Sequence, residues 1–292
     1  MMSTYKLRSV KDLEPGDHLC CLYEREEEHR ALLTPFLRQG LERREKILYI
    51  VDAHSAETVL NYLRDDGLEV EPYLKSGQLV ILTVDDAYMR DEVFNPEGMI
   101  ALLRTETERA QSEGYPTLRV TGEMTWVLRG LPGSERLIEY ESKLNKFLHN
   151  SKCLAICQYD RRRFSSKVLL DVLSTHPIAI VGTEVYDNFY YIPPEDFLGN
   201  DLLTVTLCRW LENLAGRKRI EEDREKLIRE LQEALTKVKT LTGLLPICAS
   251  CKKIRDDKGY WNQIEAYIRD HSEAEFSHGI CPECMKKLYG NM

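Results

Sequence analysis

Short apolar runs and amphipathic stretches alternate along the first 160 residues of the chain. Five runs are rich in β-branched and aromatic residues and are continuous, as in strands that are covered on both faces. They span residues 18–23, 46–52, 78–85, 117–127 and 153–160. Between them, apolar residues recur at helical spacing in 27–43, 55–67, 95–114 and 134–150. This alternation predicts a doubly wound or RecA-type three-layer α/β domain built on a parallel sheet.

A further apolar segment, 176–194, has the pattern of two more strands. We predict the turn between them at Asp187 and Asn188, because these residue types favour turns. Pro193 and Pro194 end the segment, since proline has no N–H to donate within a sheet.

Residues 217–245 are rich in charge and have no strand pattern. Their apolar residues fall in two columns seven positions apart, which is the a/d spacing of a coiled coil. The columns hold Ile220, Leu227, Ala234 and Leu241, and Leu231, Val238 and Leu245. An amphipathic helix packed back on the domain also fits. The dense charge on both edges of the stripe favours a coiled coil, and therefore a homodimer.

Composition is that of a soluble protein. The chain has 292 residues, of which 43% are hydrophobic and 30% are charged. Its apolar runs fall short of the roughly 20 residues that cross a bilayer, and its first residues lack the apolar core of a signal peptide. We therefore expect a cytoplasmic protein without a membrane partner. The net charge of -8 is spread along the chain, which argues against direct binding to nucleic acid.

The turn after the first predicted strand reads YEREEEHRA, residues 23–31. In α/β proteins this junction often binds phosphate at the start of the helix. A phosphate loop needs glycines, whose backbone N–H groups can turn inward, and a lysine. This turn has neither, and its four glutamates would repel a triphosphate. The residues favour a site without nucleotide, and a divergent ATPase is the alternative.

Seven phrases between roughly residues 15 and 178 carry a family resemblance: GDHLCCLY, GLERREKILYIV, SGQLVIL, GYPTLRVTGEMTW, IEYESKLN, CQYDRRRF and LSTHP. In order and spacing they resemble the KaiC-like branch of RecA-type ATPases. More specifically, they resemble MEDS, a sensory domain named for methanogens, methylotrophs and a dichloromethane-responsive regulator. The resemblance implies a ligand-sensing module without a phosphate loop. It also implies that the ligand is a hydrocarbon derivative or a methylated compound.

Ligands of open parallel sheets bind at the carboxyl ends of the strands. The groups predicted near those ends are Tyr23, Asp52, Glu123, Trp126, Tyr159 and Asp160. By the resemblance, Glu123 occupies the place of the metal- or water-directing carboxylate of a RecA-type enzyme. It is therefore either a ligand-binding group or a paired carboxylate of the core. Tyr23, Trp126 and Tyr159 favour a small, largely apolar ligand if they line one pocket. The alternative is that Trp126 and Tyr159 are core residues.

Two histidines and two cysteines complete the candidates in this domain. His18 and His176 match positions of the family, and they are either ligand-binding groups or core residues with satisfied hydrogen bonds. Cys20 and Cys157 lie on inner strands, where packing is the first interpretation and redox sensing the second.

The tail carries two C-x2-C pairs, Cys248 with Cys251 and Cys281 with Cys284. In a chain that we expect to be cytoplasmic, two such pairs predict one tetrahedral zinc ion held by four thiolates. His278 could replace one of the cysteines. The tail also resembles a short module that ends many bacterial PAS-, GAF- and receiver-containing signalling proteins.

These observations predict a sensory domain at 1–206, a signalling helix at 207–245 and a zinc-binding module at 246–292. The module holds seven basic and seven acidic side chains, so it offers no basic surface for nucleic acid. We predict a signal-transduction sensor, without an assigned catalytic residue, that relays ligand binding through a dimeric coiled coil to a docking or output module for a signalling partner. The alternatives are a divergent RecA-like ATPase that uses Glu123 and a transcription regulator that acts through a partner.

Overall fold

A computed structural model describes residues 9–199, 201–237, 245–272 and 274–290 of the chain. The chain divides into two compact units after Leu214. None of the helices in the described residues has both the length and the apolar character of a membrane span.

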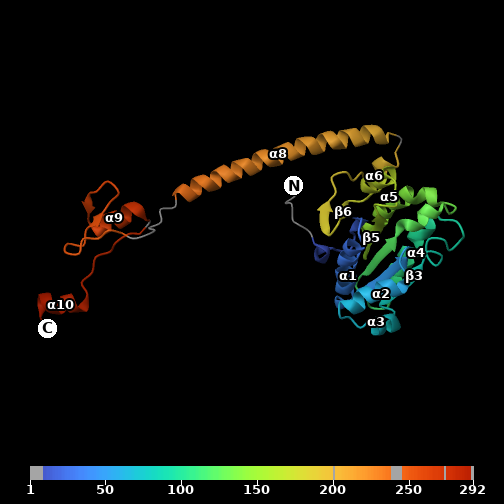
Figure 1. Ribbon diagram of the computed structural model, residues 1–292, viewed down its shortest axis with the longest axis horizontal. Coiled ribbons are helices and arrows are strands. Elements are labelled where there is room, and N and C mark those ends of the chain that lie inside the picture. Colours follow the sequence, from blue (N-terminus) through green and yellow to red (C-terminus); the bar gives the residue numbers. More distant parts are fainter. Residues whose placement is uncertain (1–8, 200, 238–244, 273, 291–292) are drawn as a thin grey trace. The chain divides into compact units, whose positions relative to one another are not determined.

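The first unit is built on one seven-stranded sheet (Figure 1). Its strands are β1 (His18–Tyr23), β2 (Lys46–Val51), β3 (Leu79–Thr83), β4 (Leu118–Glu123), β5 (Cys153–Asp160), β6 (Ile178–Val181) and β7 (Glu184–Asp187). Their order in the sheet is β3-β2-β4-β5-β1-β6-β7. All neighbours are parallel except β6 and β7, which form an antiparallel hairpin. The first strand of the chain therefore lies inside the sheet, between β5 and β6.

Helices cover both faces of this sheet and bury an apolar core against each face (Figure 1). One face packs against α1 (Glu26–Glu42) and α2 (Ala56–Asp65). The other packs against α4 (Pro96–Ser112), α5 (Leu137–Leu148) and α6 (Ser166–Thr175). Short elements complete the unit: η1 (Val10–Asp12), α3 (Glu71–Ser76), η2 (Met124–Arg129), η3 (Ser134–Arg136) and α7 (Pro194–Phe197). The predicted three-layer α/β class is confirmed.

The amphipathic pattern of α5 carries a charged group into the core. Leu137, Tyr140, Leu144 and Leu148 recur at helical spacing and are buried. Glu141 falls on the same face of the helix, because residues three and four positions apart lie side by side. Its side chain is therefore fully buried with theirs.

One predicted strand is longer than the strand in the structure. The run 117–127 was expected to be extended throughout, but β4 ends at Glu123 and the chain goes on as the 3-10 helix η2. Trp126 of η2 turns into the core, where it stacks on Tyr88 with 4.9 Å between ring centroids. Burial of this large aromatic ring outweighs the β propensity of the run.

The predicted hairpin turn is also wrong. β6 and β7 are joined at Gly182, whose φ of +63° lies in the left-handed region that glycine tolerates best. Asn188 directly follows β7 and is not part of this turn. Its Nδ2 donates to the carbonyl oxygens of Leu173 (2.6 Å) and His176 (2.7 Å), so it ties the end of the hairpin to the end of α6.

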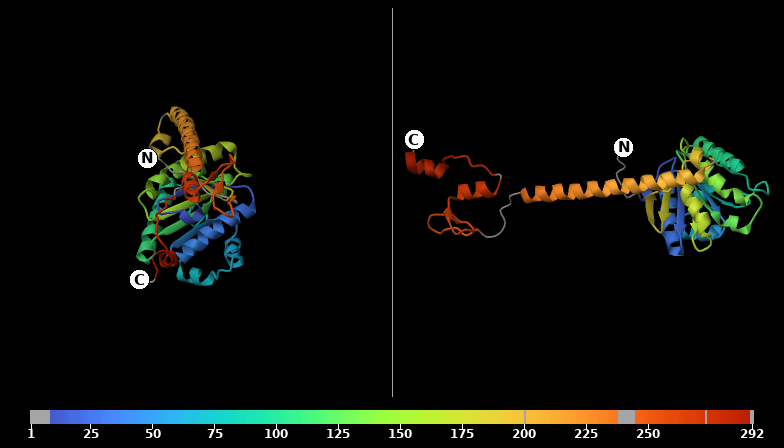
Figure 2. Two further views of the ribbon diagram at one scale, coloured as in Figure 1. Left: turned by 90° about the vertical axis from the view of Figure 1, so that its left-hand side faces the viewer. Right: turned by 90° about the horizontal axis from the view of Figure 1, so that it is seen from above.

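The long helix α8 (Leu202–Lys237) begins before residue 207, the predicted boundary, and Figure 2 shows it as one uninterrupted helix. Within the first unit, Asn213 Nδ2 donates to the carbonyl oxygen of Phe189 at 2.6 Å. Apolar side chains of α8 are exposed at Leu203, Leu207, Trp210, Leu211, Leu214, Ile220, Leu227, Ile228, Leu231 and Leu235. Val238 and Leu241 of the predicted coiled coil lie outside the described residues. The coiled coil and the dimer stay predictions.

The tail contains a small hairpin and two helices: β8 (Ile254–Arg255), β9 (Trp261–Asn262), α9 (Ile264–His271) and α10 (Pro282–Tyr289). Cys281 is the N-cap of α10, and its Sγ accepts a hydrogen bond from the N–H of Cys284 at 3.5 Å. Backbone N–H groups that follow each residue lower the pKa of Cys248 and of Cys281. A lowered pKa favours the thiolate, which is the form that binds zinc. Zinc ligation by the tail stays a prediction.

Candidate functional site

Polar side chains gather at the carboxyl ends of the central strands. We define the strand-end site as Glu26, His29, His54, Tyr62 and Glu123. Glu123 ends β4 and is buried. Its Oε1 accepts hydrogen bonds from His54 Nδ1 (3.0 Å) and Tyr49 OH (3.3 Å), and its Oε2 accepts from the N–H groups of Asp52 (3.1 Å) and His54 (2.9 Å). Glu123 therefore fixes the loop that follows β2.

That loop places His54 between two carboxylates. Its Nδ1 faces Glu123, and its Nε2 lies 2.6 Å from Oε1 of Glu26, which also accepts a hydrogen bond from the hydroxyl of Tyr62. The hydrogen bond with Glu123 is the main cause that raises the pKa of His54 to about 8. Partial burial raises the pKa of Glu26, but Tyr62 and His54 outweigh it and hold that pKa below its ordinary value. A cationic imidazole thus joins two carboxylates.

His29 stacks on His54, with 4.4 Å between ring centroids and 9° between ring planes. Its Nε2 lies 2.7 Å from Oε1 of Gln158, whose amide nitrogen donates to Thr121. The Gln158 oxygen therefore accepts from His29, and Nε2 carries the hydrogen. Burial lowers the pKa of His29, so the neutral ring keeps a lone pair on Nδ1. That nitrogen is buried without a hydrogen-bond partner, 3.9 Å from Oε1 of Glu26.

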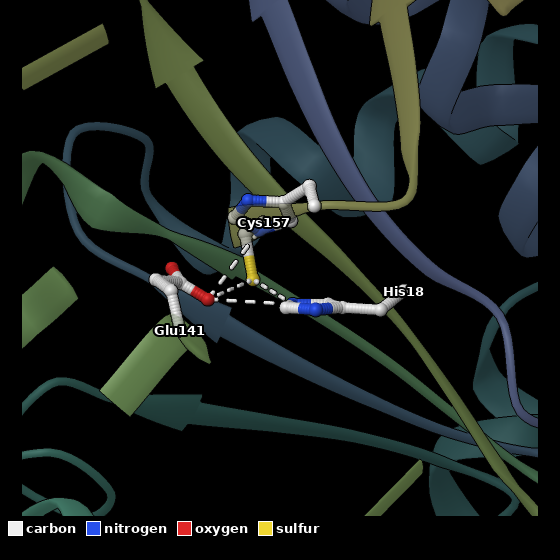
Figure 3. A group of neighbouring side chains, drawn as sticks. His18, Glu141 and Cys157 are labelled. Atoms are coloured by element: carbon white, nitrogen blue, oxygen red, sulfur yellow. Dashed lines mark hydrogen bonds and ion pairs between the residues drawn. The ribbon is translucent and has the colours of Figure 1, made fainter. Parts of the chain in front are cut away.

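A second group lies on the other face of the sheet. We define the interior cluster as His18 of β1, Glu141 of α5, Cys157 of β5 and His176, which follows α6. All four residues are buried, and Figure 3 shows His18, Glu141 and Cys157 converging. Oε2 of Glu141 lies 3.3 Å from His18 Nε2, 3.4 Å from His176 Nε2 and 3.3 Å from Cys157 Sγ. Cys157 Sγ lies 3.6 Å from His18 Nε2.

The electrostatics of the interior cluster follow from burial. Burial raises the pKa of Cys157 and of Tyr159, whose hydroxyl donates to Glu141 Oε1, and it lowers the pKa of His18. Burial also opposes ionisation of Glu141, but His176 and His18 outweigh it and hold the pKa of this carboxyl well below its ordinary value. An ionised carboxylate therefore lies inside the core.

Residues 17–177 match the family described as MEDS, the methanogen/methylotroph, DcmR sensory domain. The match covers more than half of the chain. The chain belongs to the MEDS family. Both the strand-end site and the interior cluster lie inside the MEDS domain. The resemblance seen in the sequence is confirmed, and the domain has a sensory or regulatory role.

The MEDS domain is similar to part of the transcriptional repressor DcmR of Methylorubrum extorquens, with 31% identity over 166 residues. The alignment covers 56% of this chain and 60% of the repressor, so the chain spans less than two thirds of that relative. Two solved structures are similar in fold. They are a KaiC-like protein of Pyrococcus horikoshii (TM-score 0.42, 15% identity, 57% of this chain and 71% of that chain) and the flagellar accessory protein FlaH of Methanocaldococcus jannaschii (0.44, 13%, 59% and 74%).

The site residues predicted from the sequence lie at several places in the MEDS domain. His18 and His176 belong to the interior cluster, which Tyr159 contacts. Tyr23 packs on His29, with 4.6 Å between ring centroids, at the strand-end site. Asp160 lies beside Tyr23 in the sheet and accepts hydrogen bonds from the guanidinium of Arg162.

The expected aromatic wall is wrong, because its members lie on two faces of the sheet. Trp126 and Tyr159 are fully buried in the core under α4, α5 and α6. Tyr23 belongs to the core under α1 and α2. Side chains of neighbouring strand positions point to opposite faces, so these three rings cannot line one pocket.

Five residues of the strand-end site and the interior cluster were not predicted, and Tyr62 of α2 is one of them. Glu26 and His29 lie in the first turns of α1, where an acidic first turn is common and no sequence pattern marks the histidine. His54 follows β2 and carries no local pattern. Glu141 did carry a signal, since it is an acid on the apolar face of an amphipathic helix.

Proposed function

We propose that the MEDS domain is a sensor that binds a small, largely apolar molecule carrying one hydrogen-bond donor at the strand-end site. Binding is relayed through α8, as a dimeric coiled coil, to the tail, which serves as a docking or output module. One observation carries this proposal. Nδ1 of His29 is a buried acceptor without a partner, at the sheet edge where α/β proteins bind ligands.

The surroundings of this nitrogen support the ligand class. Tyr23, His54 and Tyr62 place aromatic rings around His29, and such rings favour an apolar body. A carboxylate oxygen of Glu26 lies 3.9 Å from its Nδ1 and accepts hydrogen bonds from His54 and Tyr62. A small alcohol or a protonated methylated amine supplies the donor that His29 Nδ1 lacks, whereas phosphate would meet negative charge.

A route from the site to α8 supports the relay. The N–H of Gly182 donates to the carbonyl oxygen of Leu22 at 3.4 Å, so the turn of the β6–β7 hairpin lies beside the carboxyl end of β1. The hairpin ends at Asn188, and the next residue, Phe189, accepts the hydrogen bond from Asn213 of α8. Ligand binding that shifts this edge of the sheet would therefore move the first turns of α8. A shift requires that the ligand bind the two states unequally.

A thermal-shift screen of the full-length protein tests the proposal. Small alcohols and methylated amines are compared with hydrocarbons and ethers of the same size that have no donor, and with magnesium–ATP. We expect only the compounds that carry a hydrogen-bond donor to stabilise the protein, by on the order of 2.7 kcal/mol at a hundredfold excess over Kd. His29→Gln keeps a group near Nε2 and removes the Nδ1 acceptor, so it should weaken binding about tenfold. His149→Gln, at an exposed histidine, is the matched control.

Three results would contradict the proposal. Equal stabilisation by compounds with and without a donor would remove the role of His29. Stabilisation by magnesium–ATP would favour the divergent ATPase. Stabilisation by divalent cations that is lost in His29→Gln would make Glu26, His29 and His54 a metal site, since their ligand atoms lie within 4.8 Å of one another.

Regulation of transcription through a partner is the second candidate function. The similarity to a transcriptional repressor favours it. The tail does not favour direct DNA contact, because residues 246–292 hold seven basic and seven acidic side chains. An electrophoretic mobility assay with genomic fragments tests this point. Retardation by the purified chain alone would replace the partner-based proposal with direct DNA binding.

A further inference from the structure

Both histidines of the interior cluster direct their Nδ1–H away from it. His176 Nδ1 lies 2.8 Å from the carbonyl oxygen of Val172, which can only accept. His18 Nδ1 lies 3.0 Å from Oδ1 of Asn145, whose amide nitrogen donates to the carbonyl oxygen of Thr175 at 2.7 Å. Each Nδ1 therefore carries a hydrogen, and each Nε2 faces the cluster, where it can bind a metal ion.

Four electron-pair donors thus meet at one point inside the core: the two Nε2 atoms, Oε2 of Glu141 and Sγ of Cys157. His176 Nε2 is buried and has no hydrogen-bond partner. Acceptors that face one another away from water are costly, and a cation between them removes that cost.

The spacing of the four atoms fits a tetrahedral ion. With Zn–N and Zn–O bonds of about 2.0–2.1 Å and a Zn–S bond of about 2.3 Å, tetrahedral ligand atoms lie about 3.3–3.6 Å apart. Four of the six separations in the cluster are 3.3, 3.3, 3.4 and 3.6 Å, and the other two are within 4.8 Å. Imidazole, carboxylate and thiolate are all ligands of zinc, and one carboxylate with one thiolate neutralises a dication.

We propose that His18, Glu141, Cys157 and His176 bind one divalent transition-metal ion of the zinc class inside the MEDS domain. The hydrogen bonds of the two Nδ1 atoms are the outer contacts that orient metal-bound imidazoles. The Tyr159 hydroxyl holds the second oxygen of the carboxylate. Four protein ligands complete the coordination shell, so the ion clamps the domain and is not a catalyst.

The clamp joins elements that are far apart in the sequence: β1, α5, β5 and the junction of α6 with β6. That junction is also where α8 is anchored, because the carbonyl oxygen of His176 accepts from Asn188 and the neighbouring Phe189 accepts from Asn213. Metal occupancy therefore fixes the surface on which the first turns of α8 rest. This site is separate from the strand-end site and from the cysteines of the tail.

Cobalt substitution in the full-length chain tests the proposal. The background variant carries Cys248→Ser, Cys251→Ser, Cys281→Ser and Cys284→Ser, which remove all four thiolates of the predicted tail site. It is refolded with cobalt, and the metal content and thiolate-to-cobalt absorption are measured. Into this background, Cys157→Ser removes the proposed thiolate. Cys153→Ser is the matched control, since Cys153 is also buried on β5 but is outside the cluster.

We expect one cobalt per chain with the absorption of a single thiolate, retained in Cys153→Ser. In Cys157→Ser the absorption should vanish and the affinity should fall at least tenfold. If Cys157→Ser does not fold, the background variant tests the proposal by its stability. Its unfolding midpoint should be higher after refolding with zinc than after refolding with a chelator. Equal midpoints without cobalt uptake would overturn the proposal, as would equal loss of absorption in both serine variants. Binding at the tail does not enter either comparison.

Discussion

Glu123 shows how one side chain positions a whole site. Both of its oxygens are occupied, by the phenol of Tyr49, by the ring of His54 and by two backbone N–H groups. A carboxylate used in this way is a support for the loop after β2, not a free base. Its contribution to the strand-end site is to hold His54 against Glu26, and that geometry sets the charge of the imidazole.

The charge of His54 predicts a pH dependence. Its pKa is raised to about 8, chiefly by the hydrogen bond with Glu123. A raised pKa contributes stability that is complete below the ordinary histidine pKa of about 6.5 and is lost as pH rises through 8. In the wild type we expect the free energy of unfolding to fall between about pH 6.5 and 8.5, and in His54→Gln we expect this fall to be smaller. The difference should be less than about 2 kcal/mol, because water screens the charge of the partly exposed ring. Urea unfolding at several pH values measures it.

His149→Gln is the control for this experiment, because His149 is exposed at the end of α5. The groups that face His54 are Glu26, Glu123, His29 and Tyr62. Identical pH profiles for the wild type and His54→Gln would show that the pair of carboxylates does not hold a charged imidazole.

At the scale of elements, the sequence predicted best where one physical cause dominates. The runs at 18–23 and 153–160 have the bounds of β1 and β5, because strands covered on both faces need continuous apolar residues. α6 was not predicted although Ser165 caps it, because its short Val- and Leu-rich run fits a strand as well as a helix. The interior cluster joins residues from four elements, and no local pattern encodes such a meeting.

The exposed stripe of α8 predicts self-association. Leu227 and Leu231 are 64% and 61% exposed. An amphipathic helix normally buries its apolar face against another element. We expect the chain to be a dimer at micromolar concentration, through a parallel coiled coil at 217–245 that these residues help to form. Leu227→Asp with Leu231→Asp should give monomers whose MEDS domain stays folded. Light scattering and circular dichroism measure the two effects.

Lys226→Asp with Arg229→Asp is the matched control, since it adds the same acidic side chains away from the apolar columns. This variant should remain dimeric. A monomeric wild type, or dissociation of both variants alike, would leave the amphipathic helix packed on the domain as the interpretation.

The whole molecule combines a unit with a large core and a tail that has little core of its own. In the tail, Ile254 and Tyr267 are the buried apolar residues among those that the structure describes. Segments of this size need a metal, a disulfide or a partner to hold their structure. The two cysteine pairs are candidates to bind such a metal. The first unit has a large core of its own, so we expect it to fold without them.

We therefore predict that the tail binds one zinc ion through Cys248, Cys251, Cys281 and Cys284. Cys281→Ser should release that ion and unfold the tail, while the MEDS domain keeps its thermal unfolding transition. Cys208→Ser, at an exposed cysteine of α8, is the control. Elemental analysis and limited proteolysis measure the outcome. Unchanged metal content and an intact, protease-resistant tail in Cys281→Ser would refute the assignment.

The place of β1 in the sheet has a consequence for synthesis of the protein. β1 leaves the ribosome first, but its partners β5 and β6 come last among the parallel strands. At about 5–20 residues per second, an apolar strand waits unpaired for several seconds or more. Strands in that condition aggregate unless charged residues flank them. Glu24, Glu26, Glu27 and Glu28 follow β1 directly, so we expect this acidic turn to oppose aggregation of the growing chain.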